Sequence, residues 1–168
     1  WHNYPFYPYH QPYFSEAADY SVNLTLPQDQ VVIHSGLLKA ESGNSDGTKT
    51  ISLESERPLR DFGLSLSAEY KLESAEVSGV KINSYYLAGD DFYARKAIES
   101  AKDLMEFYAK NFTPYPYSEF NIAPVYLGYG GTQSSNLILI DTRVYRLPKF
   151  LIRYFDFLVA HETGHQWF

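Results

Sequence analysis

The sequence contains no cysteine, so disulfides and Cys-ligated metal sites are excluded. Cysteine-free chains occur on both sides of a membrane, so the cellular compartment stays open. No segment approaches the run of about 20 apolar residues that a helix needs to span a bilayer, and no basic amphipathic stretch indicates contact with a membrane surface. The net charge of −6 argues against nucleic acid as a partner, because backbone phosphates attract basic surfaces.

The remaining composition is that of a folded protein. Hydrophobic residues make up 45% and charged residues 20% of the 168 residues, which is a globular balance and not a disordered one. This length supports one good core, or two small cores that share an interface. Aromatic residues are abundant at 17% and indicate aromatic-lined surfaces without indicating an activity.

Short alternating segments fill residues 1–78 and predict strands. Apolar and polar residues alternate over 20–26 and again over 62–66. Turn-forming residues over 42–47 lead into the segment 48–53, which predicts a hairpin. The fold expected for this part is an antiparallel β-sheet or sandwich.

Residues 79–168 show a mixture of helix and strand patterns. Asp90 and Asp91 provide an N-cap and a favourable negative charge for a helix through Lys110. Pro148 is expected as the first residue of a final helix, which is apolar on nearly every side and is therefore expected to be buried. Strands are expected over 80–87 and 121–127, and residues 136–140 form a short apolar run. The pattern predicts the start of an α+β domain.

The final helix carries an HExxH pattern, with His161, Glu162 and His165 as its fixed residues. Histidines four apart project from one helix face, so both rings can reach one tetrahedral Zn²⁺ at about 2.0–2.1 Å. Glu162 is expected to act as general base toward a zinc-activated water and to pass the proton to the leaving amine. The alternative is coincidence, but polar groups in a buried apolar run are costly unless a metal satisfies them.

A catalytic zinc site needs a third protein ligand. His2, His10 and His34 have no ligand spacing and are expected to be surface or satisfied histidines. Asp141 and Asp156 are nearer, but Asp156 lies five residues before the first histidine of the motif and therefore on another helix face. No convincing third ligand is present, so the predicted site is incomplete.

Residues 161–168, in which Gln-Trp-Phe follows the second histidine, resemble the zinc helix of the aminopeptidase-N-like gluzincins. Residues 129–138 are similar to the family's GAMEN or GGMEN signature and the apolar strand after it, and residues 13–27 resemble the end of its N-terminal β domain. The resemblance implies a mixed β then α+β fold. Residues 1–78 would be the C-terminal part of that β domain, and residues 79–168 the first, incomplete part of a thermolysin-like zinc catalytic domain.

The resemblance implies that His161 and His165 are zinc ligands and that Glu162 is the catalytic base. It implies a glutamate as third ligand and a transition-state-stabilising tyrosine, both beyond the end of this chain. It also implies that a peptide substrate adds to the edge of the strand that ends in the glycine motif, where Gly130 and Gly131 allow close backbone approach. Without the zinc helix, this glycine pair is more typical of a simple turn.

The sequence departs from the family at Gln133, where the signature has a glutamate that grips the free α-amine of the substrate. A carboxylate pairs with an ammonium through charge-assisted hydrogen bonds of roughly twice the neutral strength. A carboxamide keeps an acceptor oxygen but loses the charge. We therefore expect an aminopeptidase-like hydrolase with weakened selection for a free N-terminus.

Other interpretations stay open: a zinc endopeptidase or a non-peptide hydrolase on the same scaffold, or a family member that binds peptides without catalysis. The chain alone is expected to be inactive, because two histidines are a poor zinc site. The last helix is expected to lack partners for its apolar faces, so self-association or another chain should cover them.

Overall fold

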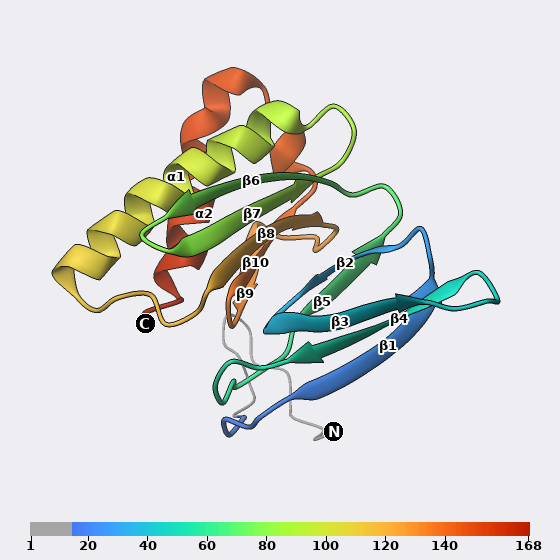
Figure 1. Ribbon diagram of the computed structural model, residues 1–168. Coiled ribbons are helices and arrows are strands. Elements are labelled where there is room, and N and C mark those ends of the chain that lie inside the picture. Colours follow the sequence, from blue (N-terminus) through green and yellow to red (C-terminus); the bar gives the residue numbers. More distant parts are fainter. Residues whose placement is uncertain (1–14) are drawn as a thin grey trace, which may run out of the picture.

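The computed structural model describes residues 15–168, which form a mixed α+β fold. Figure 1 shows both helices on one side of a five-stranded sheet and two smaller sheets on the other side. The strands are β1 (Ser21–Pro27), β2 (Val31–His34), β3 (Leu37–Gly43), β4 (Thr48–Glu54), β5 (Leu64–Ser67), β6 (Lys71–Val77), β7 (Val80–Tyr86), β8 (Glu119–Val125), β9 (Gly131–Ser134) and β10 (Leu137–Asp141). The helices are α1 (Asp91–Asn111) and α2 (Ile152–Gly164), with 3₁₀ turns at Val144–Arg146 and Lys149–Leu151. The predicted class, β followed by mixed α+β, is confirmed at this level.

The five-stranded sheet has the order β6-β7-β8-β10-β9. β8 runs parallel to both β7 and β10, whereas the outer strands β6 and β9 pair antiparallel with their neighbours. Parallel neighbours need a crossover connection, and α1 supplies it between β7 and β8. β9 is therefore an edge strand, and among residues 15–168 its hydrogen-bonded neighbour is β10.

Alternate residues of the central strands point to opposite faces of this sheet. On one face, Ile82, Phe120 and Ile138 form a core with the two helices. On the other face, Leu137 packs in a second cluster with Ile33 of β2. Each of these five side chains is fully buried, and such burial stabilises the fold by roughly 1.5–3 kcal/mol per residue. Strands buried on both faces explain the nearly continuous apolar runs in this part of the sequence.

α1 packs along β6 and β7 with one apolar face. Tyr108, also predicted for this face, is half-buried and stacks on Trp167 with ring centroids 4.9 Å apart. Asp90 occupies the N-cap position as predicted, but its side chain makes no capping hydrogen bond, which corrects that expectation. The predicted face is buried at Ala94, Ile98, Ala101 and Met105.

The N-terminal strands form two antiparallel sheets, β1-β4-β3 and β2-β5. The predicted hairpin is confirmed, and in its turn Asp46 Oδ1 accepts hydrogen bonds from the backbone nitrogen and hydroxyl of Thr48 at 3.0 and 2.6 Å. β6 pairs with β7 over its whole length, so the hydrogen-bonded sheets divide between β5 and β6. The domain division at residues 78 and 79 stays a prediction.

The final helix begins later than predicted. Pro148 is extended, with ψ of 139°, and precedes a 3₁₀ turn at Lys149–Leu151. α2 itself begins at Ile152. Proline still marks the point where the chain turns into helical structure, because its fixed φ suits an entry position.

The expectation that this helix is buried on nearly every side is wrong. Phe155 and Val159 are fully buried, but Phe150 just before α2 is 81% exposed and Phe157 is 59% exposed. The described elements that contact α2 most, α1, β9 and β10, leave its outer face open. Coverage of that face by another chain or copy stays a prediction. None of the helices within residues 15–168 has the length and apolar character that a membrane crossing requires.

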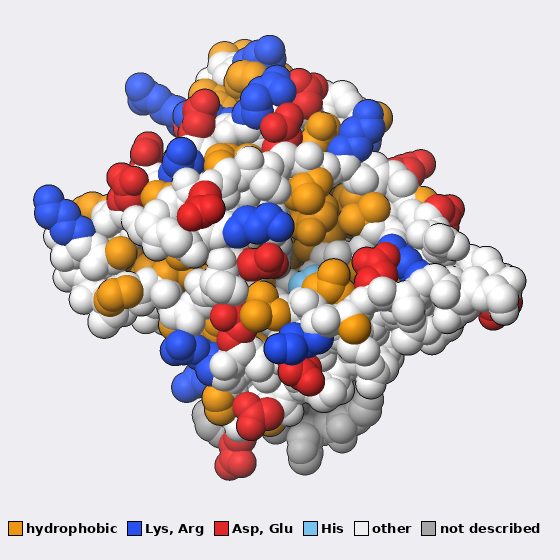
Figure 2. Space-filling view, viewed as in Figure 1, with side chains coloured by type: hydrophobic (Ala, Val, Ile, Leu, Met, Phe, Trp, Pro, Cys, Tyr) orange, Lys and Arg blue, Asp and Glu red, His pale blue; other side chains and the backbone are white. Residues whose placement is uncertain are grey.

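The surface is mixed in charge. Figure 2 shows acidic and basic side chains interspersed on one face of the molecule. Several opposite charges form exposed pairs, such as Lys39 Nζ and Glu54 Oε2 at 3.7 Å. Exposed pairs contribute only about 0–1 kcal/mol each, so the fold depends chiefly on its apolar clusters.

Candidate active site

The two histidines of the HExxH pattern meet at the C-terminal end of α2. His161 lies in the last turn, and His165 is the C-cap residue. The Nε2 atoms of the two rings are 3.2 Å apart, and the ring planes lie 86° apart. Both side chains are exposed. The four-residue spacing therefore places both imidazoles on one open face of the helix, as helix geometry predicts.

The separation of these nitrogens fits a shared zinc ion. Two nitrogens that each lie about 2.05 Å from a tetrahedral zinc are about 3.3 Å apart, and His161 Nε2 and His165 Nε2 are 3.2 Å apart. Within residues 15–168, no group of three or more His, Cys, Asp or Glu side chains could hold a metal. The pair thus offers two of the three protein ligands that a catalytic zinc requires.

The other histidines and acids considered as ligands lie elsewhere. His34 is buried, with Nδ1 3.2 Å from the carbonyl oxygen of Ser35, and burial lowers its pKa. Asp156 accepts a hydrogen bond from a serine of α1. His2 and His10 lie outside the described residues.

Glu162 lies against the main chain of β9. Its side chain is only 4% exposed, and burial raises its pKa, an effect that the neighbouring His161 opposes. A Cβ atom added to Gly131 would lie 2.9 Å from Glu162 Oε1, closer than real Cβ contacts allow. The carboxylate thus occupies the space beside the glycine, one residue after His161 and three before His165.

The glycine pair brings β9 close to α2. A Cβ atom on Gly130 would lie 3.0 Å from Leu158 Cδ2, and the one on Gly131 would meet Glu162. Gly131 also pairs with Ile140 as the first residue of β9, so it is part of a strand and not of a simple turn. The strand therefore begins at the glycine motif, which corrects the expectation of a strand that ends there, because the preceding strand β8 already ends at Val125. In the structure, the backbone approach that the glycines permit is the one between β9 and α2. The role of these glycines toward a substrate stays a prediction.

Gln133 is brought to the same region as the C-terminal end of α2. It lines a cavity of about 770 Å³, together with His165 and Gln166 from the end of α2. Arg60 and Asp61, from the segment before β5, line the same cavity. All six residues predicted for the site therefore lie on two adjoining elements, β9 with its preceding glycine and α2 with its C-cap.

Asp141 shapes the loop that leads into β9, a role that sequence reasoning missed. Its side chain is 1% exposed, and its Oδ2 accepts hydrogen bonds from the backbone nitrogens of Leu127 and Gly128 at 3.2 and 2.8 Å. The Arg143 side chain donates to Oδ1 at 2.8 Å and holds the pKa of the carboxyl far below its usual range. A local sequence feature could have predicted this role, because Asp141 ends an apolar segment and an arginine follows two residues later.

We predict that Gly131→Ala destabilises the fold by about 1–3 kcal/mol, because the new methyl group overpacks the contact between β9 and Glu162. The matched control is Gly43→Ala, where the nearest atom, Gln28 Nε2, is at an ordinary 3.7 Å. Urea unfolding of both variants measures the difference. Equal losses would contradict the packing role assigned to Gly131.

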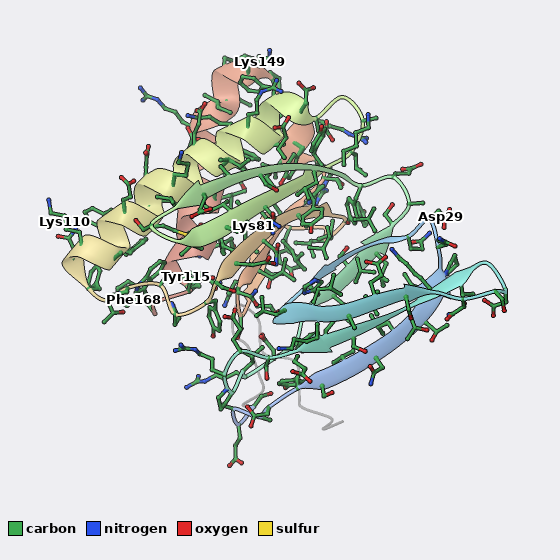
Figure 3. The ribbon with its side chains drawn as sticks, viewed as in Figure 1. Asp29, Lys81, Lys110, Tyr115, Lys149 and Phe168 are labelled. Atoms are coloured by element: carbon green, nitrogen blue, oxygen red, sulfur yellow. The ribbon has the colours of Figure 1, made fainter. Side chains whose placement is uncertain are left out.

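Asp141→Asn should lower stability at pH 7 by about 1.5–3 kcal/mol, the range for hydrogen bonds to a charged group. Because the folded-state pKa of Asp141 is depressed, its stabilisation is complete above the unfolded pKa of about 3.9 and is lost as pH falls. The variant should therefore lose less stability than the parent between about pH 4 and pH 2. Thermal unfolding across this range tests it, with exposed Asp29→Asn as the control (Figure 3).

Comparison with protein-family models finds no match to this sequence, and comparison with curated proteins finds none either. Among solved structures, the fold is similar to the crystal structure of Legionella pneumophila aminopeptidase A in complex with aspartic acid, with a TM-score of 0.80 and 18% sequence identity. The match covers 90% of this chain and 20% of that chain. This chain thus spans a fifth of the length of that protein and shares the fold of the matched region.

Proposed function

We propose that this chain is part of a zinc-dependent metallopeptidase of the aminopeptidase-N-like type, with the end of a β domain followed by the first part of a thermolysin-like catalytic domain. The observation that carries the proposal is the 3.2 Å separation of His161 Nε2 and His165 Nε2 on an exposed helix face, next to the buried Glu162. The fold shared with an aminopeptidase structure supports it. The activity is proposed for the whole protein.

His161 and His165 would hold the zinc, and the third ligand, a glutamate, is expected outside this chain. Zinc held there supplies a Lewis acid that polarises the scissile carbonyl and activates water. Two imidazoles are an incomplete ligand set. The 168-residue chain by itself should therefore turn over no peptide.

Glu162 is the proposed general base. Burial raises its pKa, so the carboxylate takes up a proton more readily than an exposed one would. A base whose pKa is closer to the working pH transfers protons more effectively. Glu162 would accept a proton from water and return it to the leaving amine.

The edge strand β9 is the proposed docking edge for the peptide. It bonds to β10 on one side, and an extended peptide can add to the other side through main-chain hydrogen bonds. Gln133 on this strand would meet the substrate with a neutral carboxamide. A neutral carboxamide should select for a free α-amine more weakly than a carboxylate does. N-blocked peptides are therefore also proposed as substrates.

In the full-length protein, Glu162→Gln should leave the zinc content unchanged and lower kcat by about 10²–10⁴, the usual contribution of a general base. His161→Ala should reduce the zinc content as well, because a ligand is lost. Metal analysis and peptide hydrolysis measure both effects. Full activity of Glu162→Gln, or zinc-free turnover by the parent, would contradict the proposed function.

Gln133→Glu in the full-length protein should raise kcat/KM on substrates with a free α-amine relative to N-blocked substrates. A charge-assisted bond adds about 1–2 kcal/mol over a neutral one, so a change of about tenfold in this ratio is expected. Gln133→Met, which cannot accept the bond through oxygen, is the control. An unchanged ratio of the two kcat/KM values would show that Gln133 does not set the selection for a free α-amine.

A further inference from the structure

The residue after the second histidine is bonded to both ends of the turn that joins β9 to β10. Gln166 Nε2 donates a hydrogen bond to the carbonyl oxygen of Ser134, the last residue of β9, at 3.0 Å. Gln166 Oε1 accepts one from the backbone nitrogen of Asn136 at 2.9 Å and one from the Tyr115 hydroxyl at 3.2 Å. A single carboxamide next to His165 thus holds the strand, the turn and the end of α2 together.

Asn136 is anchored independently of Gln166. It is fully buried and has a positive φ of 51°, a conformation that asparagine tolerates better than most residues. Its carbonyl oxygen accepts a bond from the backbone nitrogen of Asn121 at 2.9 Å. Its Oδ1 accepts from the Gly36 nitrogen at 2.8 Å, and its Nδ2 donates to the Gly36 carbonyl at 3.4 Å. The turn is therefore fixed to β8 and to the segment between β2 and β3.

Tyr115 supports the carboxamide from the other side. Its ring packs against Trp167 with centroids 5.2 Å apart. The Gln166 oxygen is therefore held between a fixed turn and a packed tyrosine. This leaves the Nε2 group directed at Ser134, where it adds a side-chain hydrogen bond between β9 and the segment after α2 to the packing of the glycine pair on the helix.

We propose that Gln166 is a positioning residue that sets the distance between β9 and the histidine pair, so that a peptide docked on β9 is presented at the right depth beside His165. The inference rests on the proposed function for the roles of β9 and His165. Gln166 acts through the main chain of Ser134, and its loss should weaken substrate binding more than it slows the chemical step.

Gln166→Glu separates the hydrogen bonds of the carboxamide oxygen from the hydrogen bond of the carboxamide nitrogen. A glutamate keeps an oxygen for Asn136 and Tyr115 but turns the donor toward Ser134 into an acceptor, which repels the carbonyl oxygen. Gln166→Met has a similar size and removes every bond. Tyr115→Phe is the matched control, because it removes one bond to Oε1 and leaves the bond to Ser134.

Hydrogen exchange of the 168-residue chain provides a readout that depends on neither zinc nor turnover. Thr132 and Ser134 lie at the hydrogen-bonded positions of the β9-β10 pair. In Gln166→Glu, their amides should exchange about fivefold to tenfold faster, which corresponds to one lost hydrogen bond, whereas the Asn136 amide keeps its protection. In Gln166→Met all three amides should exchange faster, and in Tyr115→Phe the amides of Thr132 and Ser134 should stay protected. Unchanged exchange at Thr132 and Ser134 in both Gln166 variants overturns the proposal.

Kinetics of the full-length protein distinguish positioning from a general structural role. Gln166→Glu should raise KM for peptides about fivefold to tenfold, with kcat within about twofold and zinc content unchanged. A fall in kcat or zinc content at constant KM overturns the positioning role. If the parent protein itself neither binds zinc nor cleaves peptides, the proposed function fails, and the exchange result still decides whether Gln166 positions β9. If Gln166→Glu does not fold, Gln166→Met carries the same tests.

Discussion

The contact between the main chain of β9 and the side of α2 is the constraint on which the candidate site depends. It exists because Gly130 and Gly131 have no side chains to separate the strand from Leu158 and Glu162. The approach buries the Glu162 carboxylate without removing the histidines from the open face. The same contact therefore leaves the Glu162 carboxylate buried and both imidazoles exposed to solvent. This difference in burial is consistent with the proposed roles of Glu162 as general base and of the histidines as metal ligands.

Buried polar side chains connect this contact to the rest of the molecule. Asn121 Nδ2 donates to the His34 carbonyl at 3.0 Å, and Asn83 Nδ2 donates to Asn121 Oδ1 at 3.0 Å. Together with Asn136, these amides join the five-stranded sheet to the N-terminal strands through bonds that are directional and shielded from water. Apolar packing such as that of Ile33 against Leu137 supplies stability at the same boundary, but the amides specify how the two parts align.

Local patterns predicted the features that depend on local geometry. The spacing of His161 and His165 sufficed to predict their shared face, because helical periodicity is independent of the surroundings. The hairpin and most of the α1 face followed from turn residues and from apolar periodicity for the same reason. β9 was not predicted as a separate strand, because its sequence Gly-Thr-Gln-Ser offers no apolar alternation. Its pairing with β10 is decided by the neighbouring strand.

The sequence by itself determined the chemistry available here: two imidazoles and a carboxylate at one helix, and a carboxamide at Gln133. The tertiary structure decided which of these groups is buried and what each one contacts. It showed that the glycine pair packs on α2, that Asp141 holds the loop before β9, and that one side of α2 stays open. These outcomes depend on which elements lie beside the helix, and contacts between residues far apart in the chain leave no periodic signal in it.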